Sequence, residues 1–166
     1  MKKIFLLFTA AVLSAGMAFA QDINQATENY NNGAMELQMG NNEAAIENFQ
    51  AALTMGEALG DEGADLVANC KKAIASATLS MAKDLYNAKD FEGAAAAFVK
   101  AKEVAEGYGE TEIAEEAAEL VNQANALKFN TEGKAAMKAK DFPTAISCFT
   151  KVLELDPTNG ATAVQL

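Results

Sequence analysis

One short pattern occurs three times in this chain, at residues 41–49, 90–98 and 141–149. Each copy begins with an Asn or Asp suited to capping a helix, then has Ala four residues later and Phe four residues after that. Small and large side chains therefore alternate along one face of a predicted helix. A pattern that recurs at a regular interval indicates a repeat architecture, in which each unit buries its apolar face against its neighbours. Such solenoids typically present extended surfaces to binding partners.

Most of the chain beyond residue 23 is predicted to be helical, because Ala, Glu, Lys, Leu, Gln and Met predominate and Pro occurs only near the C-terminal end. Short breakers and glycine-containing corners divide this region into pairs of helices. Apolar residues recur every three or four positions well beyond two of these corners, which predicts first helices of about 25–30 residues in the second and third pairs. The predicted fold is all-α, a solenoid of three helical hairpins at roughly residues 24–58, 62–107 and 111–156.

The three hairpins resemble the tetratricopeptide repeat, which has a small residue on its first helix and Ala, a bulky aromatic residue and another small residue on its second. The first-helix positions are Gly33, Ala82 and Gly133, and the second-helix positions are Ala45, Phe49 and Ala52, then Ala94, Phe98 and Ala101, then Ala145, Phe149 and Val152. The third copy matches best, since Pro157 closes it as in the family. Successive copies are 49 and 51 residues apart, whereas the standard repeat has about 34 residues. The resemblance is therefore to an array of extended repeats.

This resemblance implies that the first helices line a concave face and present side chains to a ligand. The positions implied are Tyr30, Leu37 and Gln38 in the first hairpin, Leu79, Lys83, Tyr86 and Asn87 in the second, and Asn130, Lys134, Met137 and Lys138 in the third. Aromatic and apolar groups at one end and lysines at the other would suit an extended peptide with apolar anchors and an acidic residue or free carboxylate. The alternative is that these lysines are ordinary solvent-exposed positions.

The composition argues against several function classes. The formal net charge is −10, and the chain contains no Arg and no His. Nucleic acids and anionic membrane surfaces are bound through Lys and Arg, so neither is an expected partner. His is the usual general base and the commonest metal ligand, and the sequence has no P-loop, no G-x-G-x-x-G and no G-x-S-x-G motif. We therefore predict that the protein is not an enzyme and requires no cofactor or metal.

Residues 1–20 have the pattern of a secretory signal peptide. Two lysines precede an apolar run over residues 4–13, and Ala18 and Ala20 are the small residues that a signal peptidase requires before its cleavage site. An uncleaved membrane anchor is the alternative, but the apolar run is shorter than the roughly 20 residues of a membrane-spanning helix. We expect export to the periplasm or envelope of a bacterium, cleavage after Ala20 and no membrane insertion afterwards.

The two cysteines, Cys70 and Cys148, lie among apolar residues at helical spacing in different hairpins. Two such cysteines do not make a disulfide scaffold, and we expect two small core residues rather than a bridge. A bridge remains the alternative in an exported protein.

The expected function is that of a scaffold or adaptor that binds a partner protein or peptide through the concave face. One alternative is a homo-oligomer closed through the last hairpin, because residues 158–166 form a short, uncharged tail rather than a solvating helix. Another alternative is a carrier of an apolar small molecule between the long helices. Its lining would be Met81, Leu85, Phe129 and Met137.

Overall fold

The structure is a computed structural model that describes residues 23–157, all of whose regular elements are helical. The predicted signal peptide, residues 1–20, and the tail, residues 158–166, lie outside the described residues. The elements are α1 (Ile23–Gln38), α2 (Asn42–Ala58), a 3₁₀ turn η1 (Gly60–Gly63), α3 (Ala64–Asn87), α4 (Phe91–Tyr108), α5 (Thr111–Ala139) and α6 (Phe142–Leu155).

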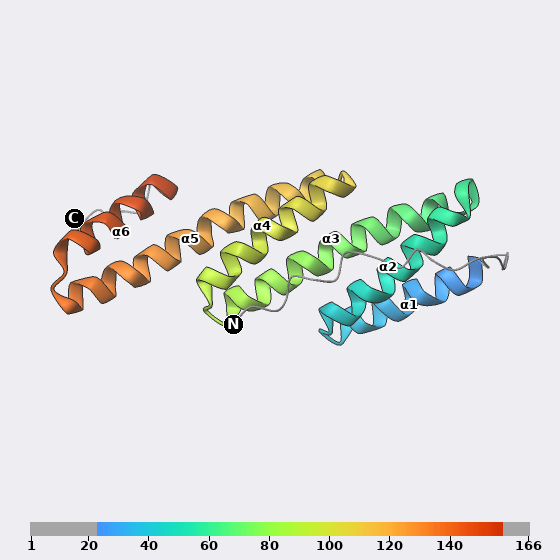
Figure 1. Ribbon diagram of the computed structural model, residues 1–166, viewed down its shortest axis with the longest axis horizontal. Coiled ribbons are helices and arrows are strands. Elements are labelled where there is room, and N and C mark those ends of the chain that lie inside the picture. The colour runs from blue at the N-terminus through green and yellow to red at the C-terminus, as the bar shows by residue number, and fades with distance from the viewer. Residues whose placement is uncertain (1–22, 158–166) are drawn as a thin grey trace, which may run out of the picture.

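Three hairpins, α1/α2, α3/α4 and α5/α6, follow one another along the long axis of the molecule (Figure 1). Each helix packs mainly against the helices before and after it in the chain. The first helices of the second and third hairpins are long, with 24 residues in α3 and 29 in α5. The all-α solenoid of three hairpins with two long first helices is therefore confirmed.

Each long helix belongs to two hairpins at once. The first half of α3 carries Cys70 and Ile74 into a cluster with Phe49 and Leu53 of α2. Its second half carries Leu79 into a different cluster, with Phe98 of α4. The residues that exceed the standard repeat length therefore form the front of α3, which closes the preceding hairpin.

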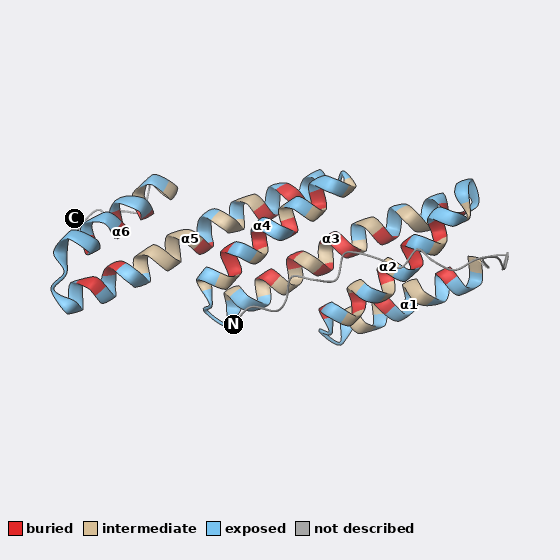
Figure 2. Cartoon of the chain, viewed as in Figure 1, coloured by how far each residue is buried: buried red, intermediate tan, exposed pale blue. Residues whose placement is uncertain are grey.

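The core is divided into separate clusters, three of which are built around a buried phenylalanine. Phe49, Phe98 and Phe149 are at most 1% exposed, and each belongs to a different cluster. Buried positions accordingly recur along every helix instead of converging on one centre (Figure 2). This nearest-neighbour packing is typical of solenoids, in which each repeat is stabilised by the repeats on either side.

The turns within the three hairpins share one backbone geometry. Gly40, Lys89 and Lys140 occupy the same place in their turns and have φ angles of 79°, 64° and 62°. The next amide in each turn donates to a carbonyl five residues earlier, as Asp90 N–H does to Leu85 O at 3.0 Å. These are Schellman motifs, which satisfy the last carbonyls of a helix and favour glycine at the left-handed position. Two of the three turns place lysine there instead.

The expected caps at the start of the second helices are present in two hairpins. The Asp90 side chain accepts a hydrogen bond from Gly93 N–H, and that of Asp141 accepts one from Thr144 N–H. The prediction is wrong for Asn41, whose side chain makes no capping bond and donates to Glu36 Oε2 at 2.8 Å. The Asn41 side-chain amide is therefore bonded to α1, not to the start of α2.

Side-chain hydrogen bonds and ion pairs also connect neighbouring hairpins. Asn42 Nδ2 at the start of α2 donates to Asp84 Oδ2 of α3 at 2.8 Å. Lys83 Nζ of α3 lies 2.6 Å from Glu116 Oε1 of α5. A third bond, from Lys128 of α5 to Glu92 of α4, measures 2.7 Å and raises the pKa of the Lys128 ammonium, because the hydrogen-bonded carboxylate favours its charged form.

Candidate functional site

The predicted binding positions of the first hairpin are largely occupied by internal packing. The Tyr30 ring lies 5.3 Å from that of Phe49, centroid to centroid, and Leu37 packs against the same cluster. Gln38 is exposed at the end of α1. Tyr30 and Leu37 therefore help to hold α1 on α2, and Gln38 is the member of this group that faces solvent.

The second hairpin shows the clearest departure from the prediction. Leu79 is only 4% exposed and belongs to the core around Phe98, so its assignment to a partner-binding face is wrong. Tyr86 is half-buried between the rings of Phe91 and Phe98, at centroid distances of 5.6 Å and 6.1 Å. The Lys83 ammonium is bound to Glu116, as described above.

Asn87, the last predicted position of the second hairpin, is exposed at the end of α3. Consecutive first helices meet at few points, so the predicted positions form three groups, one on each hairpin.

The third hairpin presents its predicted residues most openly. Lys134, Met137 and Lys138 are exposed on the last turns of α5, and Met137 is 42% exposed. Asn130 is half-buried, and its Oδ1 is buried without a hydrogen-bond partner among the described residues. An apolar side chain flanked by two ammonium groups therefore faces solvent on this helix. Such a group can take up a carboxylate together with an apolar side chain.

A groove that the sequence pattern did not indicate lies between the first two hairpins. Its volume is about 830 Å³. Asn42, at its wall, is 6% exposed and bonded to Asp84, while its Oδ1 has no partner among the described residues. The groove is lined by Gly40, Asn41, Asn42, Glu43, Ala44, Met81, Asp84, Leu85 and Ala97. It combines an apolar floor with acidic edges.

This groove can be compared with the predicted binding site for an apolar small molecule. Met81 and Leu85 line it, but Phe129 lines a different hollow, beneath Lys151, whose Nζ lies 4.7 Å from the Phe129 ring centroid. The predicted carrier residues thus do not surround one common space. The expectation of a carrier site built from them is wrong.

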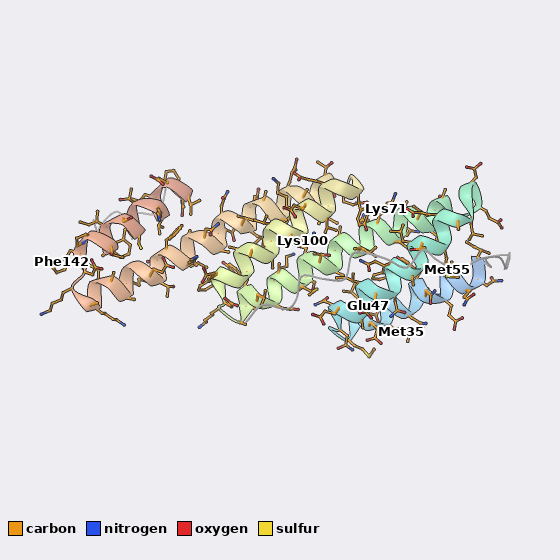
Figure 3. All side chains as sticks on the ribbon, viewed as in Figure 1. Met35, Glu47, Met55, Lys71, Lys100 and Phe142 are labelled. Atoms are coloured by element: carbon orange, nitrogen blue, oxygen red, sulfur yellow. The ribbon has the colours of Figure 1, made fainter. Side chains whose placement is uncertain are left out.

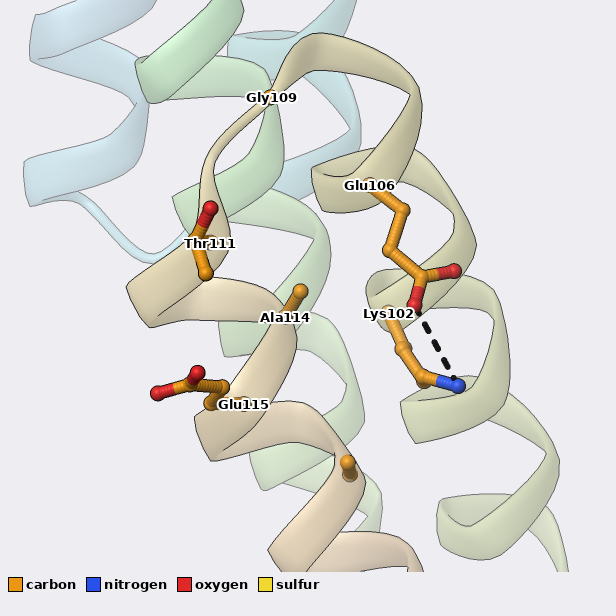
Figure 4. A pocket seen from close by; sticks show the side chains of 7 residues that line it. Lys102, Glu106, Gly109, Thr111, Ala114 and Glu115 are labelled. Carbon is orange, nitrogen blue, oxygen red and sulfur yellow. Dashed lines mark ion pairs between the residues drawn. The ribbon is translucent and has the colours of Figure 1, made fainter.

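Two smaller hollows flank α5. One of about 480 Å³ lies between Tyr86 at the end of α3, the middle of α5 and the end of α6 at Leu155. The other, of about 370 Å³, lies at the corner between α4 and α5 (Figure 4). There Lys102 pairs with Glu106 of its own helix at 3.4 Å, and Glu115 points away from both. The charges at this corner do not converge on a common point.

Comparison with known families finds a match for the third hairpin. Residues 126–159 match the family model described as tetratricopeptide repeat, a stretch that covers the second part of α5 and all of α6. The third hairpin therefore matches the tetratricopeptide repeat family. The first two hairpins lie outside the matched residues, but their turns and buried phenylalanines repeat those of the third. A comparison with curated proteins finds none that matches the chain.

The match to this family points to a general function. Tetratricopeptide repeats generally mediate protein–protein interaction, and the fold is typically not catalytic. Within residues 23–157 no three His, Cys, Asp or Glu side chains are grouped closely enough to hold a metal ion. Of the described helices, none is both long and apolar enough to cross a bilayer.

The thiols of Cys70 and Cys148 are free and buried, as expected for core residues. Burial raises the pKa of the Cys70 thiol to about 11. Burial also raises the pKa of Cys148, and the Glu132 carboxylate adds to this shift. Both sulfurs are therefore protonated at neutral pH, which is the unreactive form.

Proposed function

We propose that this protein is an exported adaptor or scaffold of the bacterial cell envelope. It binds a partner protein or peptide through the exposed end of the third hairpin's first helix. The observation that carries the proposal is the exposure of Lys134, Met137 and Lys138 on the hairpin that matches the family model. The signal-peptide pattern of residues 1–20 supports the location.

The comparison with the second hairpin explains why the third is favoured. Lys83 and Lys134 hold the same place in their repeats, one residue after the small residues Ala82 and Gly133. Lys83 is already paired with Glu116 of the following hairpin. Lys134 has no ion pair among the described residues, so its ammonium is free to meet a carboxylate of a partner.

The expected ligand is a segment with an acidic side chain or a free C-terminal carboxylate beside an apolar residue. The lysines would bind the carboxylate, and Met137 would contact the apolar group. Methionine suits this role because its flexible, polarizable side chain adapts to different shapes. A surface on rigid helices needs little reordering, which limits the entropic cost of association.

The test is affinity capture from an envelope extract with the purified protein, followed by titration of each captured protein against variants. Lys134→Glu reverses the charge at the proposed site. Lys100→Glu makes the same change on the exposed side of α4, where Lys100 lies 3.9 Å from Glu103, and serves as the matched control. Tyr86 is unsuitable as a probe, because it packs on two core rings.

We expect Lys134→Glu to weaken binding of the partner about tenfold, equivalent to about 1.4 kcal/mol. Lys100→Glu is expected to leave binding unchanged. Equal affinity in both variants and the parent protein would show that this helix is not the binding surface.

A further inference from the structure

The last helix has an apolar face that no described element covers. Phe142 is 54% exposed and Ile146 is 51% exposed, one helical turn apart at the start of α6. At the corresponding places, one residue and five residues after the turn's Asn or Asp, α2 has Asn42 and Ile46 and α4 has Phe91 and Ala95. None of these four is exposed.

The earlier helices are covered because a long helix follows each of them. Ile46 packs against the cluster to which the front of α3 contributes Cys70 and Ile74. Ala95 is 8% exposed in the cluster to which the front of α5 contributes Ala117. The exposed face of α6 thus corresponds to the faces of α2 and α4 on which the first helix of the next hairpin packs.

The opposite end of the molecule also exposes large apolar side chains. Met35, near the end of α1, is 58% exposed, and Met39, in the turn that follows α1, is 62% exposed. Figure 3 shows Phe142 at the left end of the long axis and Met35 at the lower edge of the right half, on the first hairpin. Exposed apolar groups at both ends of a solenoid can meet only if separate molecules stack end to end.

The internal junction between the first two hairpins indicates how these ends would match. Asn42, which follows the first turn, contacts Asp84, which lies two residues after the small residue Ala82. Phe142 is the counterpart of Asn42 in the third hairpin, and Met35, two residues after Gly33, is the counterpart of Asp84 in the first. The polar pair Asn42–Asp84 within the chain therefore corresponds to an apolar pair, Phe142 and Met35, at the two ends.

The charge around the turn between α5 and α6 is complementary to that of the first hairpin. Residues 23–58 carry five Glu and no Lys, whereas residues 133–151 carry four Lys and one Asp. Opposite charges would favour contact between the first hairpin of one molecule and the last hairpin of another, and would disfavour contact between two identical ends.

We propose that the protein assembles head to tail, with the α6 face of one copy seated on the first hairpin of a second copy. Phe142 and Ile146 of one molecule contact Met35 and Met39 of the next. The two surfaces differ, so the contact is heterologous and continues into a chain of copies instead of closing as a symmetric dimer. This inference does not depend on the adaptor function.

The test measures molar mass by sedimentation and light scattering, over about 1 µM to about 1 mM protein. The purified full chain is used, with its processed N-terminus determined by mass spectrometry. We expect the mass to rise with concentration beyond that of a dimer, and to fall at high salt because the complementary charges are screened. A monomer at every concentration, or a mass that stops at the dimer, would overturn the proposal.

Two blocked variants make the test specific for a heterologous contact. Phe142→Glu blocks the α6 end and Met35→Glu blocks the first-hairpin end, both at side chains more than half exposed. Each variant alone is expected to stay monomeric, because every contact needs one intact copy of each end. An equimolar mixture is expected to form a dimer and nothing larger, since it contains one compatible pair of ends.

Val99→Glu, at a 43% exposed position of α4, is the matched control and is expected to assemble like the parent protein. Ile146→Glu provides a second block of the α6 end. Circular dichroism and thermal unfolding confirm that each variant is folded. Full assembly of either blocked variant, or failure of the mixture to form a dimer, would contradict the head-to-tail contact.

Discussion

The ring of Phe149 lies so close to the backbone of Gly133 that a β-carbon at residue 133 would come 2.7 Å from Phe149 Cε1. The first hairpin repeats this relationship, since a β-carbon on Gly33 would come 2.8 Å from the Phe49 ring. Both rings are almost completely buried. In each of these hairpins, the missing side chain of a first-helix glycine makes room for the aromatic ring of the second helix.

Gly133→Ala is therefore expected to destabilise the protein although it replaces a helical glycine with a better helix former. The added methyl group must displace the Phe149 ring, and overpacking of this kind costs about 1–3 kcal/mol. Urea denaturation followed by circular dichroism measures the loss. Gly107→Ala is the matched control, because Gly107 lies in α4 with no neighbouring atom within 4 Å of an added β-carbon.

The control variant should gain about 0.5–1 kcal/mol from helix propensity alone. If Gly133→Ala were as stable as Gly107→Ala, the close contact with Phe149 would not hold in solution.

Much of the fold could be predicted because the recurring pattern identifies the residues that pack between the two helices of each hairpin. An Ala and a Phe on each second helix, and a small residue on each first helix, identify the two faces that must meet in each hairpin. The stripe through Cys70 and Ile74 predicts a long helix, because it continues at helical spacing without a breaker. These signals are local and depend on helical periodicity alone.

The candidate site was predicted less well, because the position of a residue on a helix does not show what covers it. The sequence pattern places Leu79 on a binding face, but Leu79 is buried because α4 packs across that part of α3. The groove near Asn42 requires the turn of one hairpin and two helices of another, which no single periodic pattern describes. Such surfaces depend on the angles between helices.

The left-handed lysines offer a second test of the structure. Lys140 has a φ of 62°, a conformation that costs non-glycine residues about 1 kcal/mol. Lys140→Gly should thus stabilise the protein by a few tenths of a kcal/mol to about 1 kcal/mol, after the greater freedom of glycine in the unfolded chain is deducted. Thermal unfolding would record a higher midpoint.

The comparison for this change is Lys72→Gly, on the exposed side of α3. There glycine should lower the stability by about 1 kcal/mol, because the backbone is helical and has no left-handed strain for glycine to relieve. A loss of stability in both variants would contradict the turn geometry.

The corner between α2 and α3 depends on two glycines in contact. A β-carbon on Gly63 would collide with the carbonyl oxygen of Gly56, a backbone atom that cannot move aside as a side chain can. Gly63→Ala is expected to destabilise the protein by about 3 kcal/mol, at the upper end of overpacking costs. Because this corner sets how α3 covers α2, tryptophan introduced at Leu66 should also become more exposed to a fluorescence quencher. Unchanged stability and quenching would show that the backbone segments at Gly56 and Gly63 are further apart.

The buried thiol of Cys70 should make stability depend on pH in the alkaline range. Its pKa rises from 9.0 to about 11 on folding, so the unfolded chain ionises first as the pH increases. The contribution is fully present below pH 9 and is lost as the pH rises toward 11, because the unfolded state then binds fewer protons. Urea denaturation of the parent protein and of Cys70→Ala at several pH values between 7 and 11 isolates the effect, since tyrosines and lysines titrate in both.

The Cys70→Ala variant is expected to be about 1 kcal/mol less stable at pH 7, because it leaves a small cavity, yet to lose less stability above pH 9. Parallel pH profiles for the two proteins would show that the Cys70 sulfur is accessible to water.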